Sequence, residues 1–251
     1  MESEVVKVIC PSHKRADRVL TKKIINNLAL CVPEAQAEDY KQHNPECEII
    51  EHPDDIIGLP LKRQWIYEQY KNVFMLDDDV DGVVRRYEDS SRPNMEKDPE
   101  FIYDLIQTTA LNALNAECKM YGFSNIPTPI SYVSMHPIKM SGYIGGHATG
   151  MLESEHLNWN ECEGKAVEDF WISGLNAYHY RKMFIDTRFC FHQRDTFTNR
   201  GGLAEFRNLE QEEFDTKWLQ RMFGKDVIQR KQNSKMRSLK TQSERRMKLP
   251  F

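Results

Sequence analysis

The sequence predicts an α/β fold, with a mixed central sheet flanked by helices. From Val5 to Asp79, short β-branched runs alternate with amphipathic stretches, which is the pattern of parallel βαβ units. The run Val73–Leu76 is apolar throughout, as expected of a strand covered on both faces. With 251 residues and 40% hydrophobic side chains, the chain can bury one large core. We therefore expect a single α/β domain.

The first half of the chain gives the clearest elements. Apolar runs bounded by Pro, Gly or charged residues predict four strands, at residues 5–10, 29–33, 48–51 and 73–76. Residues 21–28 and 34–43 have helical character, and a Gly- and Pro-punctuated loop from residue 54 becomes an amphipathic helix by residue 67. Gly82 marks the point where the chain can turn away from the last of these strands.

The second half is read in the same way. Residues 88–98 are polar and predict a loop, and residues 99–120 predict a long helix with one apolar face. Strands are expected at 130–135 and 184–191, and helices are expected to begin at the acidic pair 168–169 and to span residues 205–223. Between them, residues 141–152 hold four glycines, which let backbone approach a ligand closely or form a hairpin.

Composition limits the classes of protein that remain. The chain has 34 Lys and Arg against 38 Asp and Glu, a net charge of −4, which by itself argues against a polyanionic partner. Its six cysteines are scattered without a C-x-x-C pair, so we expect reduced thiols. No apolar run approaches 18 residues and no signal peptide is recognisable, so the sequence predicts a soluble cytoplasmic protein.

Three adjacent carboxylates follow the 73–76 strand directly. Asp77, Asp78 and Asp79 would repel one another and resist burial unless a hard cation or several hydrogen-bond donors were present. The crevice beyond the carboxyl ends of strands is where open α/β sheets bind ligands. A divalent ion that also holds a diphosphate would explain the cluster, and a solvated acidic turn is the structural alternative.

Two segments expected near these acids carry basic residues. The loop after the first strand runs from Pro11 to Arg18 and carries a hydroxyl and several cations suited to a phosphate or nucleoside, or to a plain surface turn. Lys62 and Arg63 lie in the first turn of a helix, where cations oppose the helix dipole. An anionic ligand shared with the free N–H groups of that helix would account for them.

Two later features are more ambiguous. Glu168 and Asp169 could face a cleft from the start of their helix, although acids in a first turn are also ordinary dipole-compensating residues. His192, after the last strand, is either a structural hydrogen-bonding group or a metal ligand.

In this order, the features resemble the GT-A class of nucleotide-sugar glycosyltransferases. The resemblance spans residues 5–195, with Asp77-Asp78-Asp79 as the D-x-D motif. It implies a glycosyltransferase domain over residues 1–223, divided into a nucleotide-binding half (1–82) and an acceptor half (83–223), followed by a basic tail (224–251). The small size and the tail look most like phage enzymes that glycosylate hydroxymethylated pyrimidines in DNA, which are related to the base J glucosyltransferases.

The resemblance also implies roles for individual residues. Mn²⁺ or Mg²⁺ would be bound by Asp79, Asp77 and His192. The UDP-sugar would be contacted by Ser12, Arg15, Lys62, Arg63, Asp77, Asp78, Gly145, Gly146 and His147. If the reaction inverts the anomeric centre, Asp169 would take the acceptor's proton, with Glu168 as second choice, whereas in a retaining enzyme neither need act as a base.

The tail supplies the link to duplex DNA in this interpretation. Between Lys225 and Phe251 there are nine basic and two acidic residues, which suits a polyanion but also a solvated end. The expected DNA contacts are Arg230, Lys231, Lys235, Arg237, Lys240, Arg245 and Arg246. The predicted activity is transfer of a sugar from a UDP-sugar to 5-hydroxymethylcytosine. The alternatives are a glycan, lipid or protein acceptor, nucleotidyl transfer, and a noncatalytic DNA-binding module.

Overall fold

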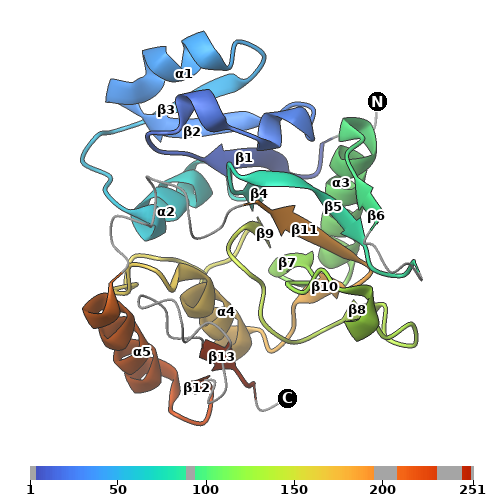
Figure 1. Cartoon of the computed structure of the whole chain (residues 1–251). Coiled ribbons are helices and arrows are strands. Elements are labelled where there is room, and N and C mark those ends of the chain that lie inside the picture. The colour runs from blue at the N-terminus through green and yellow to red at the C-terminus, as the bar shows by residue number, and fades with distance from the viewer. Residues whose placement is uncertain (1–3, 89–93, 195–207, 231–244, 250–251) are drawn as a thin grey trace.

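An eight-stranded mixed sheet runs through the centre of the chain (Figure 1). The computed structural model describes residues 4–88, 94–194, 208–230 and 245–249. The strands of the large sheet are β1 (Lys7–Pro11), β2 (Ala29–Pro33), β3 (Glu48–His52), β4 (Val73–Leu76), β7 (Met120–Phe123), β8 (Ile138–Lys139), β9 (Ala148–Met151) and β10 (Phe184–Asp186), in the order β3-β2-β1-β4-β9-β7-β10-β8. Strands β3, β2, β1 and β4 are parallel, and β9 runs antiparallel to both β4 and β7.

The described residues also form two smaller sheets. The first is antiparallel, with the order β11-β5-β6, and consists of β5 (Val80–Arg85), β6 (Asn94–Glu96) and β11 (Phe189–Gln193). The second pairs β12 (Ile228–Arg230) with β13 (Arg245–Met247). Because β4 belongs to the large sheet and β5 to the first small one, residues 77–79 form the corner between two sheets.

Five α-helices complete the described fold. They are α1 (Ala37–His43), α2 (Leu59–Tyr70), α3 (Pro99–Asn115), α4 (Glu168–His179) and α5 (Leu209–Phe223), with 3-10 turns η1 (Ala16–Arg18), η2 (Thr21–Lys23), η3 (Glu34–Gln36) and η4 (Pro129–Ser131). The side chains of Asp98 and Asn208 cap α3 and α5 by accepting hydrogen bonds from backbone N–H groups of their first turns. In the described ranges, no helix combines the length and apolar character needed to cross a membrane.

The inner strands of the large sheet bury both of their faces. On one face, Val8, Leu30 and Phe74 pack with α1, α3 and the first small sheet. On the other, Ile9 and Met75 pack with α2, α4 and α5. Because side chains alternate along each strand, they contribute to two apolar layers, one on each face of the sheet. The continuous apolar runs in the sequence predicted strands covered on both faces. The mixed α/β fold with helices on both faces is confirmed.

The helix predicted at residues 21–28 is wrong. Only the 3-10 turn η2 forms there, because this segment bonds to the backbone of the acidic corner. The Leu20 N–H donates to the Asp78 carbonyl at 2.8 Å, and the Thr21 hydroxyl donates to the Asp77 carbonyl at 2.5 Å. Gly82 does not turn the chain away but lies inside β5, and the polar segment 88–98 contains β6.

Three boundaries in the second half also differ from the prediction. Helix α3 ends at Asn115, and Glu117 adopts a left-handed φ of 54°, so residues 120–123 are free to form β7. The strand predicted at 130–135 does not form, and Ile130 is 96% exposed, without a neighbouring strand. The run 184–191 is divided between β10 and β11, because a turn stabilised by Asp186 and Arg188 carries the chain from one sheet to the other.

Candidate active site

The acidic motif lies at the corner between β4 and β5, beside the end of β1. Asp78, in the middle, points inward and is 5% exposed. Its carboxylate accepts a hydrogen bond from the Ser12 hydroxyl at 2.5 Å and from the Arg15 guanidinium at 2.7 Å. The Ser12 hydroxyl also lies 2.7 Å from the Tyr40 hydroxyl. Asp78 therefore holds the loop after β1 against the motif, which agrees with the sequence grouping of these residues.

The outer two carboxylates converge on one point. The side-chain nitrogen of Gln193, on β11, donates to Asp77 Oδ2 and to Asp79 Oδ1, both at 3.1 Å. Burial raises the pKa of Asp77 to about 8; Arg63 opposes this rise and Asp79 adds to it. Burial and then Asp78 raise the pKa of Asp79 to about 6. Burial and mutual repulsion thus disfavour two charged carboxylates at this point, where one donor bridges them.

This donor set fits a divalent cation. Mg²⁺ is ordinarily held by one or two carboxylates together with substrate phosphates, and hard oxygen ligands suit Mn²⁺ as well. The third ligand that the sequence suggested is placed differently. His192 Nδ1 lies 2.7 Å from Asp81 Oδ1, and the described residues contain no group of three His, Cys, Asp or Glu side chains placed to hold a metal. Asp77 and Asp79 are brought together, and His192 does not join them.

Arg63 connects the motif to the glycine-rich segment. Its side chain is 1% exposed, and Nη2 donates to the Gly146 carbonyl at 2.6 Å and to Asp77 Oδ1 at 3.2 Å. The same nitrogen is 3.8 Å from Glu168 Oε1. A Cβ on Gly146 would lie 3.0 Å from that Glu168 oxygen and 3.2 Å from Arg63, so only glycine fits this close approach comfortably. Arg63 is therefore buried inside the site.

Asp169 is held in a fixed orientation at the start of α4. Its Oδ2 accepts hydrogen bonds from the Tyr143 hydroxyl and, at 3.3 Å, from the Gly146 N–H. Its Oδ1 accepts from the Phe170 N–H at 2.8 Å. Tyr143 also packs on the Phe170 ring, with centroids 4.5 Å apart. Three donors thus fix one carboxylate beside the glycine-rich segment.

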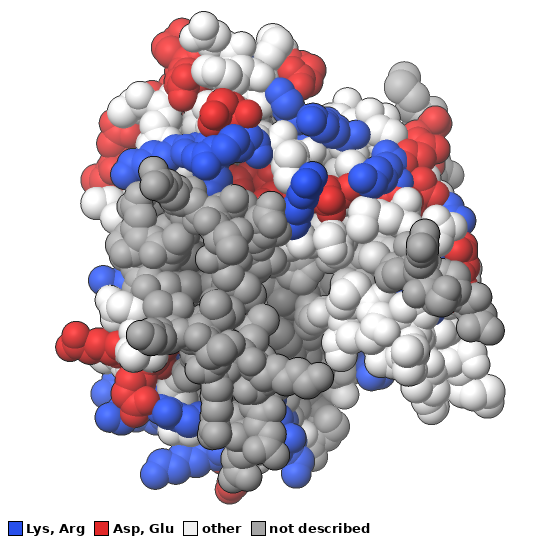
Figure 2. All heavy atoms as spheres, in the orientation of Figure 1, with Lys and Arg blue, Asp and Glu red and all other residues white. Residues whose placement is uncertain are grey.

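A cleft of about 270 Å³ opens at the Asp78–Asp79 side of the motif. Three arginines line it, namely Arg15, Arg18 and Arg194, together with Asp17 and Leu20. Figure 2 shows basic side chains lying across the N-terminal half of the molecule with acidic ones beside them. A cleft lined by both arginines and carboxylates suits a phosphate group bridged by a cation.

Lys62, like Arg63, is expected from the sequence to contact the donor but is placed deeper. Lys62 is 6% exposed, and its amine donates to the Ser12 carbonyl at 2.7 Å. Burial lowers the pKa of Lys62 to about 8. Burial likewise lowers the pKa of His147 to about 4, so its imidazole is neutral near pH 7. Lys62 therefore positions the loop after β1. Gly145, another expected donor contact, donates its N–H to Asn125 Oδ1 at 2.8 Å.

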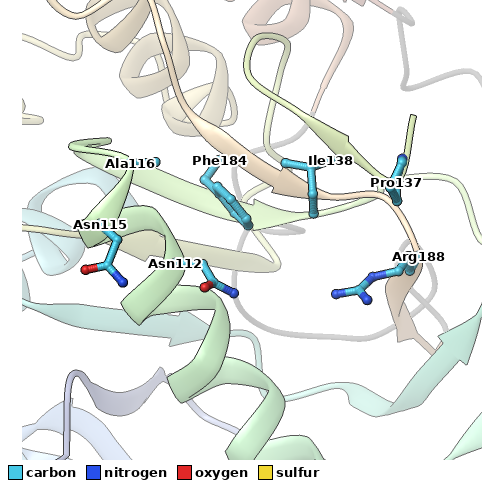
Figure 3. Close-up of a pocket in the computed structure, with 7 residues that line it drawn as sticks. All are labelled: Asn112, Asn115, Ala116, Pro137, Ile138, Phe184 and Arg188. Carbon is cyan, nitrogen blue, oxygen red and sulfur yellow. The ribbon is translucent and has the colours of Figure 1, made fainter. Parts of the chain in front are cut away.

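A larger hollow, of about 530 Å³, lies away from these residues. Figure 3 shows it between the end of α3 and the strands β8 and β10. Asn112 and Asn115 border it on the helix side, and Phe184 and Ile138 on the sheet side. Arg188 also lines it, but its guanidinium is bound to Asp186 at 2.7 Å. No carboxylate of the acidic motif lines this hollow, so we place the candidate active site at the smaller cleft.

The basic tail begins as part of the fold. Ile228, on β12, is fully buried in the core that holds α5. Arg245 is buried in an ion pair with Glu212, and Arg230 pairs with Glu213. Arg246 donates to Gln229, so these three cations are engaged with α5 and the β12–β13 pair. The other expected DNA contacts, Lys231, Lys235, Arg237 and Lys240, lie outside the described residues.

Comparison with known proteins decides the family. A sequence model of the TET-Associated Glycosyltransferase family matches residues 6–202. The chain belongs to this family. It is therefore a member of a glycosyltransferase family, and the matched range contains the motif, the cleft, Asp169 and Gln193.

The other comparisons concern curated proteins and solved structures. No curated protein sequence matches this chain. Among solved structures, it is similar to residues 1–349 of TarS from S. aureus, with 10% sequence identity and a TM-score of 0.38. The match covers 71% of this chain and 56% of that chain, so the glycosyltransferase spans little more than half of the TarS structure.

Sequence reasoning missed Gln193 and Tyr143. Both are polar residues in segments already singled out, the end of the last strand and the glycine-rich stretch. No spacing rule distinguishes Gln193 from its neighbour His192, since the choice depends on how β11 pairs with β5. Tyr143 could have been noticed as an aromatic residue with a polar end among glycines, because buried Tyr hydroxyls need a hydrogen-bond partner.

Proposed function

We propose that this enzyme transfers a sugar from a UDP-sugar to the hydroxymethyl group of a modified pyrimidine, 5-hydroxymethylcytosine, in DNA, with Mn²⁺ or Mg²⁺ as cofactor. The observation that carries this proposal is the convergence of Asp77 Oδ2 and Asp79 Oδ1 on one point beside an arginine-lined cleft. Two carboxylates and several arginines match a diphosphate bridged by a cation.

The donor side of the reaction follows from this cleft. The bound cation would neutralise the charge that develops on the leaving diphosphate. Asp77 and Asp79 would hold it, and Arg15 lines the cleft where the phosphates would lie. Ser12, Asp78 and Lys62 keep the loop that carries Arg15 in place. The protein's own contribution is thus a preorganised set of charges around the phosphates.

The acceptor side is assigned to Asp169. If the transfer inverts the anomeric centre, a carboxylate must take the proton of the hydroxymethyl group. Asp169 is oriented by Tyr143 and the Gly146 N–H, whereas Glu168 is 4% exposed and lies beside Arg63. Asp169 is therefore the better placed base. Gly146 keeps the backbone close to this carboxylate, and the acceptor would approach along the glycine-rich segment.

A nucleic-acid acceptor is supported by three features. The family's description associates these glycosyltransferases with TET, and the sequence resembles phage enzymes that glycosylate hydroxymethylated pyrimidines in DNA. The basic composition after residue 224 suits a polyanion. A glycan, lipid or protein acceptor would use the same donor site and would differ only in what enters beside Asp169.

The test is a transfer assay with identified products. The purified protein is incubated with Mn²⁺, a panel of UDP-sugars and duplex DNA with or without 5-hydroxymethylcytosine, and the released nucleosides are analysed by mass. A mass increase of one sugar on the modified base alone is expected. Asp79→Asn should abolish it, and Asp39→Asn, an exposed carboxylate on α1, should not. UDP release without any modified nucleoside would move the acceptor elsewhere, and no consumption of donor would refute the proposal.

A further inference from the structure

We propose that Gln193, and not His192, is the residue from the first small sheet that completes the divalent-cation site. This inference rests on the proposed function, because it concerns the same cation. Gln193 would have two roles. Its amide N–H₂ group holds Asp77 and Asp79 together in the metal-free protein, and its amide oxygen becomes a ligand when the cation is bound.

The first evidence is the position of the Gln193 amide. One nitrogen lies 3.1 Å from a carboxylate oxygen of Asp77 and 3.1 Å from one of Asp79. A donor shared by two carboxyl oxygens occupies a place where positive charge is favourable. The other polar atom of a Gln amide is an acceptor, and a half-turn about the last side-chain bond exchanges the two. The same side chain can therefore face two carboxylates or a cation.

The second evidence is the register of β11 against β5. His192 is opposite Gly82, and Gln193 is opposite Val80, so Asp81 is an extra residue on β5 at this point. Such a bulge changes the direction of the side chains beside it. At the bulge, the Asp81 carboxylate lies beside the His192 ring, with Asp81 Oδ1 2.7 Å from His192 Nδ1. The bulge thus pairs His192 with Asp81.

A backbone bond fixes the reach of Gln193. The N–H of the next residue, Arg194, donates to the Asp79 carbonyl at 3.0 Å. Strand β11 is therefore tied to the acidic corner on one side of Gln193, while His192 is tied to Asp81 on the other. The pairing of His192 with Gly82 holds the backbone on the other side as well, so the Gln193 amide stays within reach of the two carboxylates while it turns.

The resulting ligand set has a chemical consequence. Two carboxylates and an amide oxygen are all hard ligands, the type preferred by Mg²⁺ and Mn²⁺. An imidazole in the same place would favour transition metals over Mg²⁺. We therefore infer that the site accepts Mg²⁺ as well as Mn²⁺, and that Gln193→His shifts its preference toward Mn²⁺.

The experiment measures Mn²⁺ binding directly. Free Mn²⁺ is quantified by its EPR signal during titration of the full chain, with and without UDP, and Mg²⁺ is then added as competitor. We expect Gln193→Ala to weaken Mn²⁺ binding by about 10-fold or more, in the range found when groups around a metal site are removed. Gln193→Glu should strengthen it by adding a third carboxylate. His192→Ala, the neighbouring control, should change it by less than about 3-fold.

Each other outcome counts against a specific claim. If His192→Ala weakens binding and Gln193→Ala does not, His192 is the ligand and this inference is overturned, while the proposed function stands. If the wild-type chain binds neither ion, even with UDP, the metal-dependent function fails as well. Gln193→Asn serves as a second variant if Gln193→Ala unfolds, because it keeps the amide on a side chain too short to reach both carboxylates. Unchanged Mn²⁺ affinity in a folded Gln193→Asn protein would refute the inference.

Discussion

Replacing Arg63 by Met tests whether the buried guanidinium holds the site together. The change keeps a long apolar side chain within α2 and removes every charged contact. It takes away hydrogen bonds to the Gly146 carbonyl and to Asp77, and leaves Glu168, whose side chain is 5% exposed, without the cation that lies 3.8 Å from it. Three parts of the site, the acidic corner, the glycine-rich segment and the start of α4, lose their common partner.

The size of the effect can be estimated from these contacts. Removing one partner of a buried ion pair costs about 3–5 kcal/mol. Against this, Nε and Nη1 of Arg63 are buried without a hydrogen-bond partner among the described residues, and removing a buried unsatisfied group relieves about 1–3 kcal/mol. We therefore expect Arg63→Met to lower the free energy of unfolding by about 2 kcal/mol, the difference between the midpoints of these two ranges.

Urea unfolding of the metal-free protein at pH 7 provides the measurement. Lys62→Met is the matched control, because it removes the adjacent buried cation, whose amine is bonded to a neutral carbonyl. Arg63→Lys should restore little, since an ammonium group lacks the planar fork of a guanidinium. An Arg63→Met protein within about 1 kcal/mol of the wild type would show that the guanidinium contributes almost no net stability, and the reasoning would be refuted.

Four further predictions concern other parts of the molecule. Asp169→Asn should lower turnover by about 10²–10⁴-fold while UDP binding is unchanged, if the carboxylate is a general base; steady-state rates and calorimetry measure the two, and an unchanged rate removes Asp169 from the mechanism. Gly146→Ala should also reduce turnover, because its Cβ would lie only 3.0 Å from Glu168 Oε1, and full activity would mean that the segment can shift. Arg245→Met should cost about 3–5 kcal/mol in urea unfolding, as expected for a buried pair with Glu212; unaltered stability would free this arginine for another role. Lys62, whose pKa is lowered to about 8, binds its proton less tightly in the folded state than in the unfolded state. The wild type should therefore gain stability relative to Lys62→Met as pH rises from 8 to 10.5, by at most about 3 kcal/mol, and a constant difference would show that the amine is solvated.

The parts of the fold predicted correctly are those that local patterns determine. The four parallel strands of the first half and the start of α2 follow from apolar runs and from Gly58 and Pro60. The errors occur where distant residues decide. Residues 21–28 bond to the acidic corner instead of forming a helix, and Ile130 stays exposed without a partner strand. Tertiary contacts of this kind overrule local propensity.

The same division applies to the candidate site. The grouping of Ser12 and Arg15 with the acids could be predicted, because the carboxyl ends of neighbouring parallel strands meet at one edge. The burial of Lys62 could not, since Lys is usually exposed. The choice between His192 and Gln193 depends on a bulge in the partner strand, which leaves no mark in the spacing of β11 itself.

The placement of the acidic motif between two sheets also has a consequence for how the enzyme is made. Gln193 comes 116 residues after Asp77 along the chain, so the ribosome completes the acidic corner long before the strand that draws its carboxylates together. During that interval the nascent chain holds three neighbouring acids without the side chain that bridges two of them. The bridge therefore forms only when β11 joins β5, and a chain cut short before β11 would carry the three acids without it.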